Sequence, residues 1–127
     1  MKKNIILIID DCQIYQSALQ MIVEKAGFVS EIYGDGMQGM IRTNGDMDHV
    51  AAVLLDIYMP EIDGISLLGH LRSKYPGLPI YIISGSDDVD DKTGVLALGA
   101  AGYIPKPMDS AAIEHLGSLL QQLGHAS

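Results

Sequence analysis

Acidic side chains stand directly after two short apolar runs of this sequence. Asp10 and Asp11 follow the apolar run 5–9, and Asp56 follows the apolar run 50–55. Carboxylate oxygens are the ligands that Mg²⁺ prefers, and a carboxylate can also attack an activated phosphoryl group. One of the first two acids could simply cap a helix, but two adjacent carboxylates repel each other without a counter-charge. The three acids therefore predict a Mg²⁺ site, with Asp56 as the group that accepts a phosphoryl group.

A hydroxyl and an ammonium group stand in the same way after two later apolar runs. Ser84 follows the run 80–83, and Lys106 follows the run 103–105 and precedes a second proline, Pro107. A hydroxyl can donate to a phosphoryl oxygen, and an ammonium group can pair first with a carboxylate and then with the phosphoryl group. Taken alone, Ser84 is equally explained by a turn with the glycine that follows it, and a lone lysine is usually a surface residue. Beside the three acids, both are expected to bind a phosphoryl group.

The short apolar runs alternate with segments of helical periodicity. Continuous runs of this length are typical of buried strands in a parallel sheet. The expected strands are 4–9, 29–33, 50–56, 80–83 and 102–104, and the expected helices are 13–26, 37–43, 65–75, 89–98 and 109–123. This alternation predicts an α/β fold, a doubly wound five-stranded parallel sheet of flavodoxin-like order 2-1-3-4-5 with five helices. Ligands bind outside the carboxyl ends of such strands, so the five candidate residues should meet at one edge.

Apolar residues recur at helical spacing in the first and last expected helices. The stripe of the first helix consists of Ile14, Ala18, Ile22 and Ala26, and that of the last helix consists of Ile113, Leu116, Leu120 and Leu123. Such a stripe is the face that an amphipathic helix turns toward a core. Asp109 or Ser110 is expected to cap the last helix.

Composition limits the class of protein. A chain of 127 residues with 48% hydrophobic residues is large enough for one domain with a buried core, here residues 1–127. A net charge of −8 argues against binding of nucleic acid and suits a protein partner with a basic patch. No apolar run approaches the roughly 18 residues of a membrane span, and a cytoplasmic location is expected by default. The single Cys12 excludes an intramolecular disulfide.

The candidate residues lie within four longer motifs. These are Asp10-Asp11, Asp56-Ile57-Tyr58-Met59-Pro60-Glu61-Ile62-Asp63-Gly64, Ser84-Gly85 and Gly99-Ala100-Ala101-Gly102-Tyr103-Ile104-Pro105-Lys106-Pro107. In this order and strand context, they resemble the receiver domain of two-component response regulators, and the resemblance covers essentially the whole chain. It implies a domain of phosphorelay signalling. Such a domain takes a phosphoryl group from a histidine kinase or a phosphotransfer protein and then changes conformation.

The resemblance also implies roles for individual residues. Asp56 is expected to be the phosphoacceptor, and Ser84 and Lys106 are expected to bind the phosphoryl group as its catalytic partners. Tyr103 is expected to act with Ser84 as a switch, and the Lys106–Pro107 bond is expected to be cis. The implied Mg²⁺ ligands are Asp10, Asp11, Asp56 and the backbone carbonyl of Tyr58.

The resemblance further implies where partners bind. Receiver domains alter the face formed by their fourth helix, fifth strand and fifth helix, here expected at 89–98, 102–104 and 109–123. This face would contact a downstream effector protein or an output domain, and the resemblance also allows a phosphorylation-dependent dimer. The expected chemistry is phosphorylation and dephosphorylation of the domain itself, with no separate substrate turned over.

Two other classes of protein share part of this pattern. A haloacid-type phosphatase also uses an aspartate nucleophile, but it needs a second acid two residues later, where this chain has Tyr58. A flavodoxin-like cofactor-binding module needs a loop rich in hydroxyls and glycines after the first strand. Here Asp10 and Asp11 would repel a phosphate at that place. A receiver that signals without phosphate is disfavoured by the complete set of five site residues.

Overall fold

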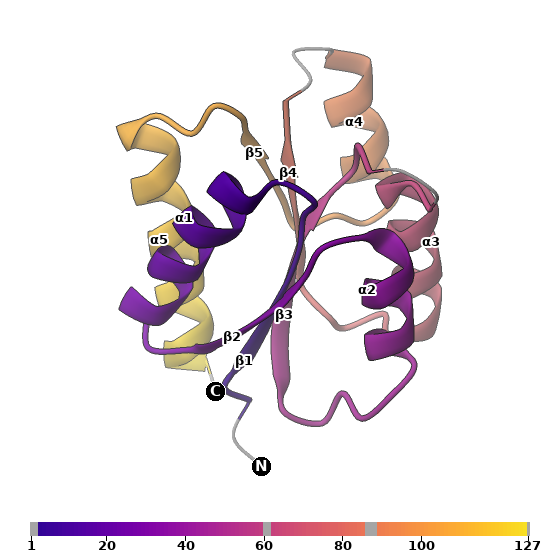
Figure 1. Ribbon diagram of the computed structural model, residues 1–127, viewed down its shortest axis with the longest axis horizontal. Helices are drawn as coiled ribbons and strands as arrows, with labels where there is room; N and C mark the ends of the chain where they lie inside the picture. Colours follow the sequence, from indigo (N-terminus) through magenta and orange to yellow (C-terminus); the bar gives the residue numbers. More distant parts are fainter. Residues whose placement is uncertain (1–2, 60–61, 86–88, 127) are drawn as a thin grey trace.

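Five parallel strands form the sheet that positions the candidate residues (Figure 1). The computed structural model describes residues 3–59, 62–85 and 89–126. The strands in these ranges are β1 (Ile5–Ile9), β2 (Val29–Tyr33), β3 (Val50–Asp56), β4 (Ile80–Ser84) and β5 (Gly102–Pro105). Their order is β2-β1-β3-β4-β5, and every neighbouring pair is parallel, which confirms the predicted topology. Pro60 and Glu61 of the second motif lie outside the described residues.

The helices of the described ranges cover both faces of the sheet. They are α1 (Gln13–Lys25), α2 (Gly36–Thr43), α3 (Gly64–Lys74), α4 (Val89–Ala97) and α5 (Ser110–Ala126). One face is covered by α1 and α5, and the other is covered by α2, α3 and α4 (Figure 1). The predicted helices agree with these bounds within one residue, except that α5 continues three residues further, to Ala126.

The sheet is buried on both faces because successive side chains of a strand point to opposite sides. Ile8 and Leu54 pack in the core shared with α1 and α5. Their neighbours Leu7 and Leu55 pack in the core shared with α3 and α4. Burial on both sides explains why the strands are continuous apolar runs in the sequence. The polar residues that end these runs stand where the sheet reaches its carboxyl edge.

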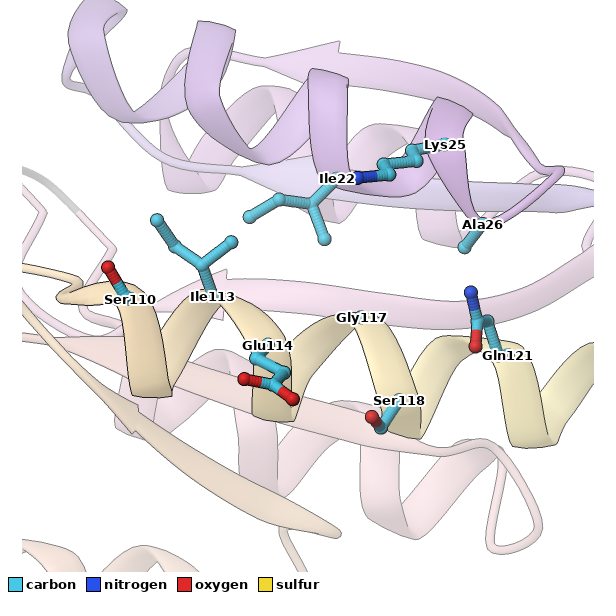
Figure 2. A pocket seen from close by; sticks show the side chains of 9 residues that line it. All are labelled: Ile22, Lys25, Ala26, Ser110, Ile113, Glu114, Gly117, Ser118 and Gln121. Carbon is cyan, nitrogen blue, oxygen red and sulfur yellow. The ribbon is translucent and has the colours of Figure 1, made fainter.

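The stripe predicted for α1 is not the face that this helix buries most deeply. Leu19 and Val23 are fully buried, whereas Ile14, at the start of the predicted stripe, is 78% exposed. The helix carries two apolar stripes, and periodicity alone does not decide which one faces the sheet. Ile22 of the predicted stripe lines a groove between α1 and α5, on the wall opposite Ile113 (Figure 2). This groove contains none of the predicted site residues.

The stripe predicted for α5 is confirmed at its centre and wrong at its start. Leu116 and Leu120 are fully buried against the sheet, whereas Ile113 is 42% exposed. Asp109, the first of the two candidate caps, accepts a hydrogen bond from the backbone N–H of Ala112 at 2.8 Å. The predicted cis bond between Lys106 and Pro107 is confirmed.

The connection from β3 to α3 brings two backbone segments unusually close. The backbone N–H of Gly64 donates to the carbonyl of Ile57 at 3.1 Å. A Cβ atom at Gly64 would lie 2.3 Å from the Cα of Ile57 and 2.4 Å from the carbonyl oxygen of Asp56. Real Cβ atoms do not approach backbone atoms so closely, so the start of α3 can lie against the end of β3 only with glycine at this position.

We expect Gly64→Ala to destabilise the protein, because its methyl group would overlap backbone atoms. The loss in free energy of unfolding should be about 1–3 kcal/mol, measured by urea denaturation. Gly69→Ala in the same helix is the matched control, because nothing lies within 4 Å of a Cβ atom there. Alanine at that position should stabilise the protein by about 0.5–1 kcal/mol through helix propensity. Equal effects of the two substitutions would contradict the close approach at Gly64.

Candidate functional site

Lys106 joins two buried carboxylates at the carboxyl edge of the sheet. Its ammonium nitrogen lies 2.9 Å from Oδ2 of Asp10 and 3.3 Å from Oδ2 of Asp56. Asp10 follows the last residue of β1, Asp56 is the last residue of β3, and Lys106 follows the last residue of β5. The backbone N–H of Lys106 also donates to the carbonyl of Ser84 at 2.7 Å, at the end of β4. The sheet thus brings together residues that are far apart in the sequence.

Other acids near this edge serve as helix caps. Asp35, Asp63 and Asp109 each accept a hydrogen bond from a backbone N–H in the first turn of the following helix. Asp10 differs from them. Its Oδ1 accepts a hydrogen bond at 2.9 Å from the backbone N–H of Cys12, the N-cap residue of α1, and its Oδ2 faces Lys106. Helix capping therefore does not account for this carboxylate.

Burial and ion pairing act against each other in the electrostatics of the cluster. Asp10 is 1% exposed and Asp56 is 4% exposed. Burial raises the pKa of Asp56, although the backbone N–H of Tyr58, which donates to Oδ1 at 3.0 Å, and the charge of Lys106 partly offset this effect. Burial by itself would lower the pKa of Lys106, but its contacts with Asp10 and Asp56 outweigh burial and raise the pKa above its ordinary value. Lys106 therefore stays charged and compensates two acids at once.

The acids at this edge offer oxygen ligands to a cation. Asp10, Asp11 and Asp56 each place one carboxylate oxygen within 4.8 Å of the other two, the one such group of potential metal ligands among the described residues. Oδ2 of Asp10 is buried and has no well-directed hydrogen bond, even though Lys106 lies within ion-pair distance. Asp11 is exposed, so the group is open to solvent. A set of clustered carboxylate oxygens with access to water suits Mg²⁺, which keeps several of its waters.

The two residues expected to form the switch lie on neighbouring strands beside the cluster. Ser84 ends β4 and is fully buried. Tyr103 in β5 pairs with Ile82 of β4 and packs, partly buried, against the core shared with α3 and α4. Because side chains alternate along a strand, Ser84 points to the same face of the sheet as Ile82, and thus as Tyr103. Tyr58, whose backbone carbonyl is the fourth expected metal ligand, follows β3 and is 54% exposed.

Two residues of α1 complete the surroundings of the cluster and were not predicted. The ring of Tyr15 lies against the ammonium group of Lys106, with 4.3 Å between the nitrogen and the ring centre. The side-chain amide of Gln16 donates to the backbone carbonyl of Asp10 at 2.7 Å. Tyr15 precedes the buried Leu19 by about one helical turn, so it extends the buried face of α1 to the edge of the sheet. The helical spacing between Tyr15 and Leu19 was the signal in the sequence that could have identified Tyr15 as a residue of the site.

Comparisons with known proteins relate the sequence and the fold to one family. The family model described as "Response regulator receiver domain" matches residues 6–116. The transcriptional regulatory protein CseB of Streptomyces coelicolor is 30% identical over 95% of this chain, and the transcriptional regulatory protein QseB of Haemophilus influenzae is 33% identical over 93%. Each alignment covers 51% of the relative, so the chain spans about half the length of these proteins.

Solved structures show the same likeness. The receiver domain of the Francisella response regulator 1452 is 26% identical with a TM-score of 0.84, and the match covers 97% of this chain and 98% of that chain. A chain in the crystal structure of the CheX–CheY–BeF₃–Mg²⁺ complex from Borrelia burgdorferi is a second match, 26% identical with a TM-score of 0.82. It covers 91% of this chain and 88% of the matched chain.

We expect Asp56→Asn to raise the free energy of unfolding of the metal-free protein at pH 7. Burial raises the pKa of Asp56 in the folded state above its value in the unfolded chain. The ionised carboxylate therefore costs stability. This cost is absent below the pKa of the carboxyl group in the unfolded chain, about 4. It grows as pH rises through the folded-state pKa. The gain from Asp56→Asn should thus shrink as pH falls toward and below 4.

Urea denaturation in EDTA between pH 3.5 and 7.5 measures this difference. Asp48→Asn, which neutralises an exposed acid outside the cluster, is the matched control and should show no comparable rise with pH. A stability of Asp56→Asn that equals or falls below that of the wild-type protein at pH 7 would contradict the electrostatic description of the site.

Proposed function

This chain belongs to the response regulator receiver domain family, and on that premise we propose that Asp56 accepts a phosphoryl group with the help of Lys106, Ser84 and Mg²⁺. The observation that carries the proposal is the contact of one ammonium group with two buried carboxylates, one of them at the end of the central strand. A simple ion pair needs only one acid. Here the second acid, Asp10, also belongs to an oxygen cluster that suits a cation.

The proposed step is the attack of a carboxylate oxygen on a phosphoryl group. Oδ1 of Asp56 accepts the backbone N–H of Tyr58, so Oδ2, the oxygen that faces Lys106, is the one placed to attack. The new O–P bond forms as the bond from phosphorus to its donor breaks, the P–N bond of a phosphohistidine or the P–O bond of acetyl phosphate. The electron pair of the broken bond leaves with the donor. The product is an acyl phosphate, and Lys106 and Ser84 stabilise its phosphoryl oxygens.

The proposed Mg²⁺ ligands are Asp10, Asp11, Asp56 and the backbone carbonyl of Tyr58. When bound, Mg²⁺ supplies positive charge that offsets the negative charge of the transferring phosphoryl group. The three clustered carboxylate oxygens support this assignment. Attack of water on the acyl phosphate would restore the carboxylate of Asp56, so the chemistry stays within the domain.

The proposed output is a change of the face formed by α4, β5 and α5. A phosphoryl group on Asp56 would draw the hydroxyl of Ser84 toward it and leave space behind β4. Tyr103, on the same face of the sheet, is the large side chain placed to move inward. The partner would be a downstream effector or an output domain, and the same change could pair two phosphorylated copies. The two transcriptional regulators matched above are about twice the length of this chain, which supports a link to an output domain.

Residues 1–127 would then form one receiver domain whose phosphoryl donor is a histidine kinase or a phosphotransfer protein. Receiver domains of response regulators act with such kinases and with output domains. Among the helices that the structure describes, none has the length and apolar character needed to cross a membrane. The cytoplasmic location expected from the sequence stays a prediction.

We expect incubation with acetyl phosphate and Mg²⁺ to add one phosphoryl group to the protein, detected by intact-protein mass spectrometry. The label should be absent from Asp56→Asn and absent when EDTA removes the cation. Asp63→Asn is the matched control, because Asp63 only caps α3, and it should be labelled like the wild-type protein. Undiminished labelling of Asp56→Asn would refute the assignment of the phosphoacceptor.

We expect Lys106→Ala to accept the phosphoryl group about ten- to a hundredfold more slowly, because one charged hydrogen bond is lost. The variant should also fail to transmit the conformational change from the site to α4 and β5. In the wild-type protein, beryllofluoride with Mg²⁺ should shift the amide resonances of α4 and β5, and these shifts should be absent from the variant. Lys25→Ala, on the exposed surface of α1, is the control and should behave like the wild-type protein. Wild-type shifts in Lys106→Ala would exclude this role of the lysine.

A further inference from the structure

Two periodicities of the fold place the ring of Tyr15 against the ammonium group of Lys106. In α1, Tyr15 lies about one turn before the buried Leu19 and so faces the sheet. Ile104 of β5 packs in the core shared with α1 and α5, and Lys106, one residue beyond the end of β5, lies on the same face by alternation. The nitrogen lies 4.3 Å from the ring centre, well inside the range of about 6 Å for cation–π contacts. The contact therefore follows from the packing of α1 on this face of the sheet.

The attractions on this ammonium group differ in how a bound cation affects them. Two come from Asp10 and Asp56, at 2.9 Å and 3.3 Å, and both acids belong to the proposed Mg²⁺ ligands. A cation on these carboxylates would repel the ammonium group and weaken both ion pairs. The ring of Tyr15 is no metal ligand, so its attraction for the ammonium group persists when Mg²⁺ binds.

We propose that Tyr15 is a positioning residue, whose ring holds the ammonium group of Lys106 at the site while Mg²⁺ occupies the neighbouring carboxylates. Lys106 is then in place when the phosphoryl donor arrives. The inference rests on the proposed phosphorylation of Asp56 and deepens it. The ring face makes the contact, so the aromatic ring is required and the hydroxyl of Tyr15 is not.

Two substitutions of Tyr15 separate the effect of its aromatic ring from the effect of its apolar volume. Tyr15→Phe keeps the ring face, and Tyr15→Leu keeps apolar volume without an aromatic ring. At saturating Mg²⁺, labelling of Asp56 by acetyl phosphate should be about two- to fivefold slower in Tyr15→Leu, the range that partly exposed cation–π contacts provide. Tyr15→Phe should react at the wild-type rate. Equal rates in all three proteins, or equal slowing in both variants, would overturn the proposal.

A spectroscopic measurement tests the contact in the wild-type protein without phosphoryl transfer. The ε-methylene carbon of Lys106 is bonded to the nitrogen that contacts the ring of Tyr15, so ring current should move the resonances of its protons upfield. The signals are assigned by their absence from Lys106→Met. The upfield shift should occur in the wild-type protein and in Tyr15→Phe, with and without Mg²⁺, and be lost in Tyr15→Leu.

The two measurements also distinguish this proposal from the proposed function. Loss of the upfield shift when Mg²⁺ is added would overturn the role of Tyr15, even if Asp56 is labelled normally. A wild-type protein that acetyl phosphate does not label would refute the proposed phosphorylation. In that case the shift measured with Mg²⁺ still decides whether Tyr15 holds Lys106.

Discussion

The ammonium group of Lys106 is the counter-charge that allows two carboxylates to be buried at the edge of the sheet. Asp10 and Asp56 are almost fully removed from water, and burial of an ionised carboxylate is costly unless a partner compensates it. Lys106 lies within ion-pair distance of both. The parallel sheet makes this arrangement possible, since each residue stands at the carboxyl end of a different strand. The meeting of these residues at one edge is therefore a consequence of the topology.

The same constraint explains how a rigid fold could respond to a change of charge. One ammonium group is shared between two acids, so a cation or phosphoryl group bound to these acids changes the charge that the ammonium group faces. The backbone N–H of Lys106 donates a hydrogen bond to the carbonyl of Ser84, at the end of β4. Lys106 also follows Tyr103 of β5 by three residues. A change of charge at Asp56 would therefore act first on the two strands that border α4. Among the residues of α4 whose burial is described, 92–97, only Val95 is buried, and a helix with so few buried contacts moves at little cost.

The positions of the strands and of the polar residues at their ends could be predicted from the sequence. A strand that is buried on both faces is a continuous apolar run, and the run ends abruptly at a polar residue. The position of Asp56 at the end of β3, and its approach to Lys106, follow from that pattern and from the strand order. The orientation of α1 could not be predicted in the same way, since Ile14 and Leu19 belong to two stripes of similar hydrophobicity. Only packing against the sheet selects the face of Leu19, and this choice brings Tyr15 to the site.

A crystal structure of the protein with Mg²⁺ and beryllium fluoride would test most directly whether these residues form one site for a phosphoryl group and a cation. We expect beryllium fluoride on Oδ2 of Asp56 and Mg²⁺ between the carboxylates of Asp10, Asp11 and Asp56. The ammonium group of Lys106 should leave Asp10 and contact a fluoride. Beryllium fluoride bound away from Asp56, or Lys106 still paired with Asp10 beside a Mg²⁺ ion held elsewhere, would contradict the shared role of this cluster.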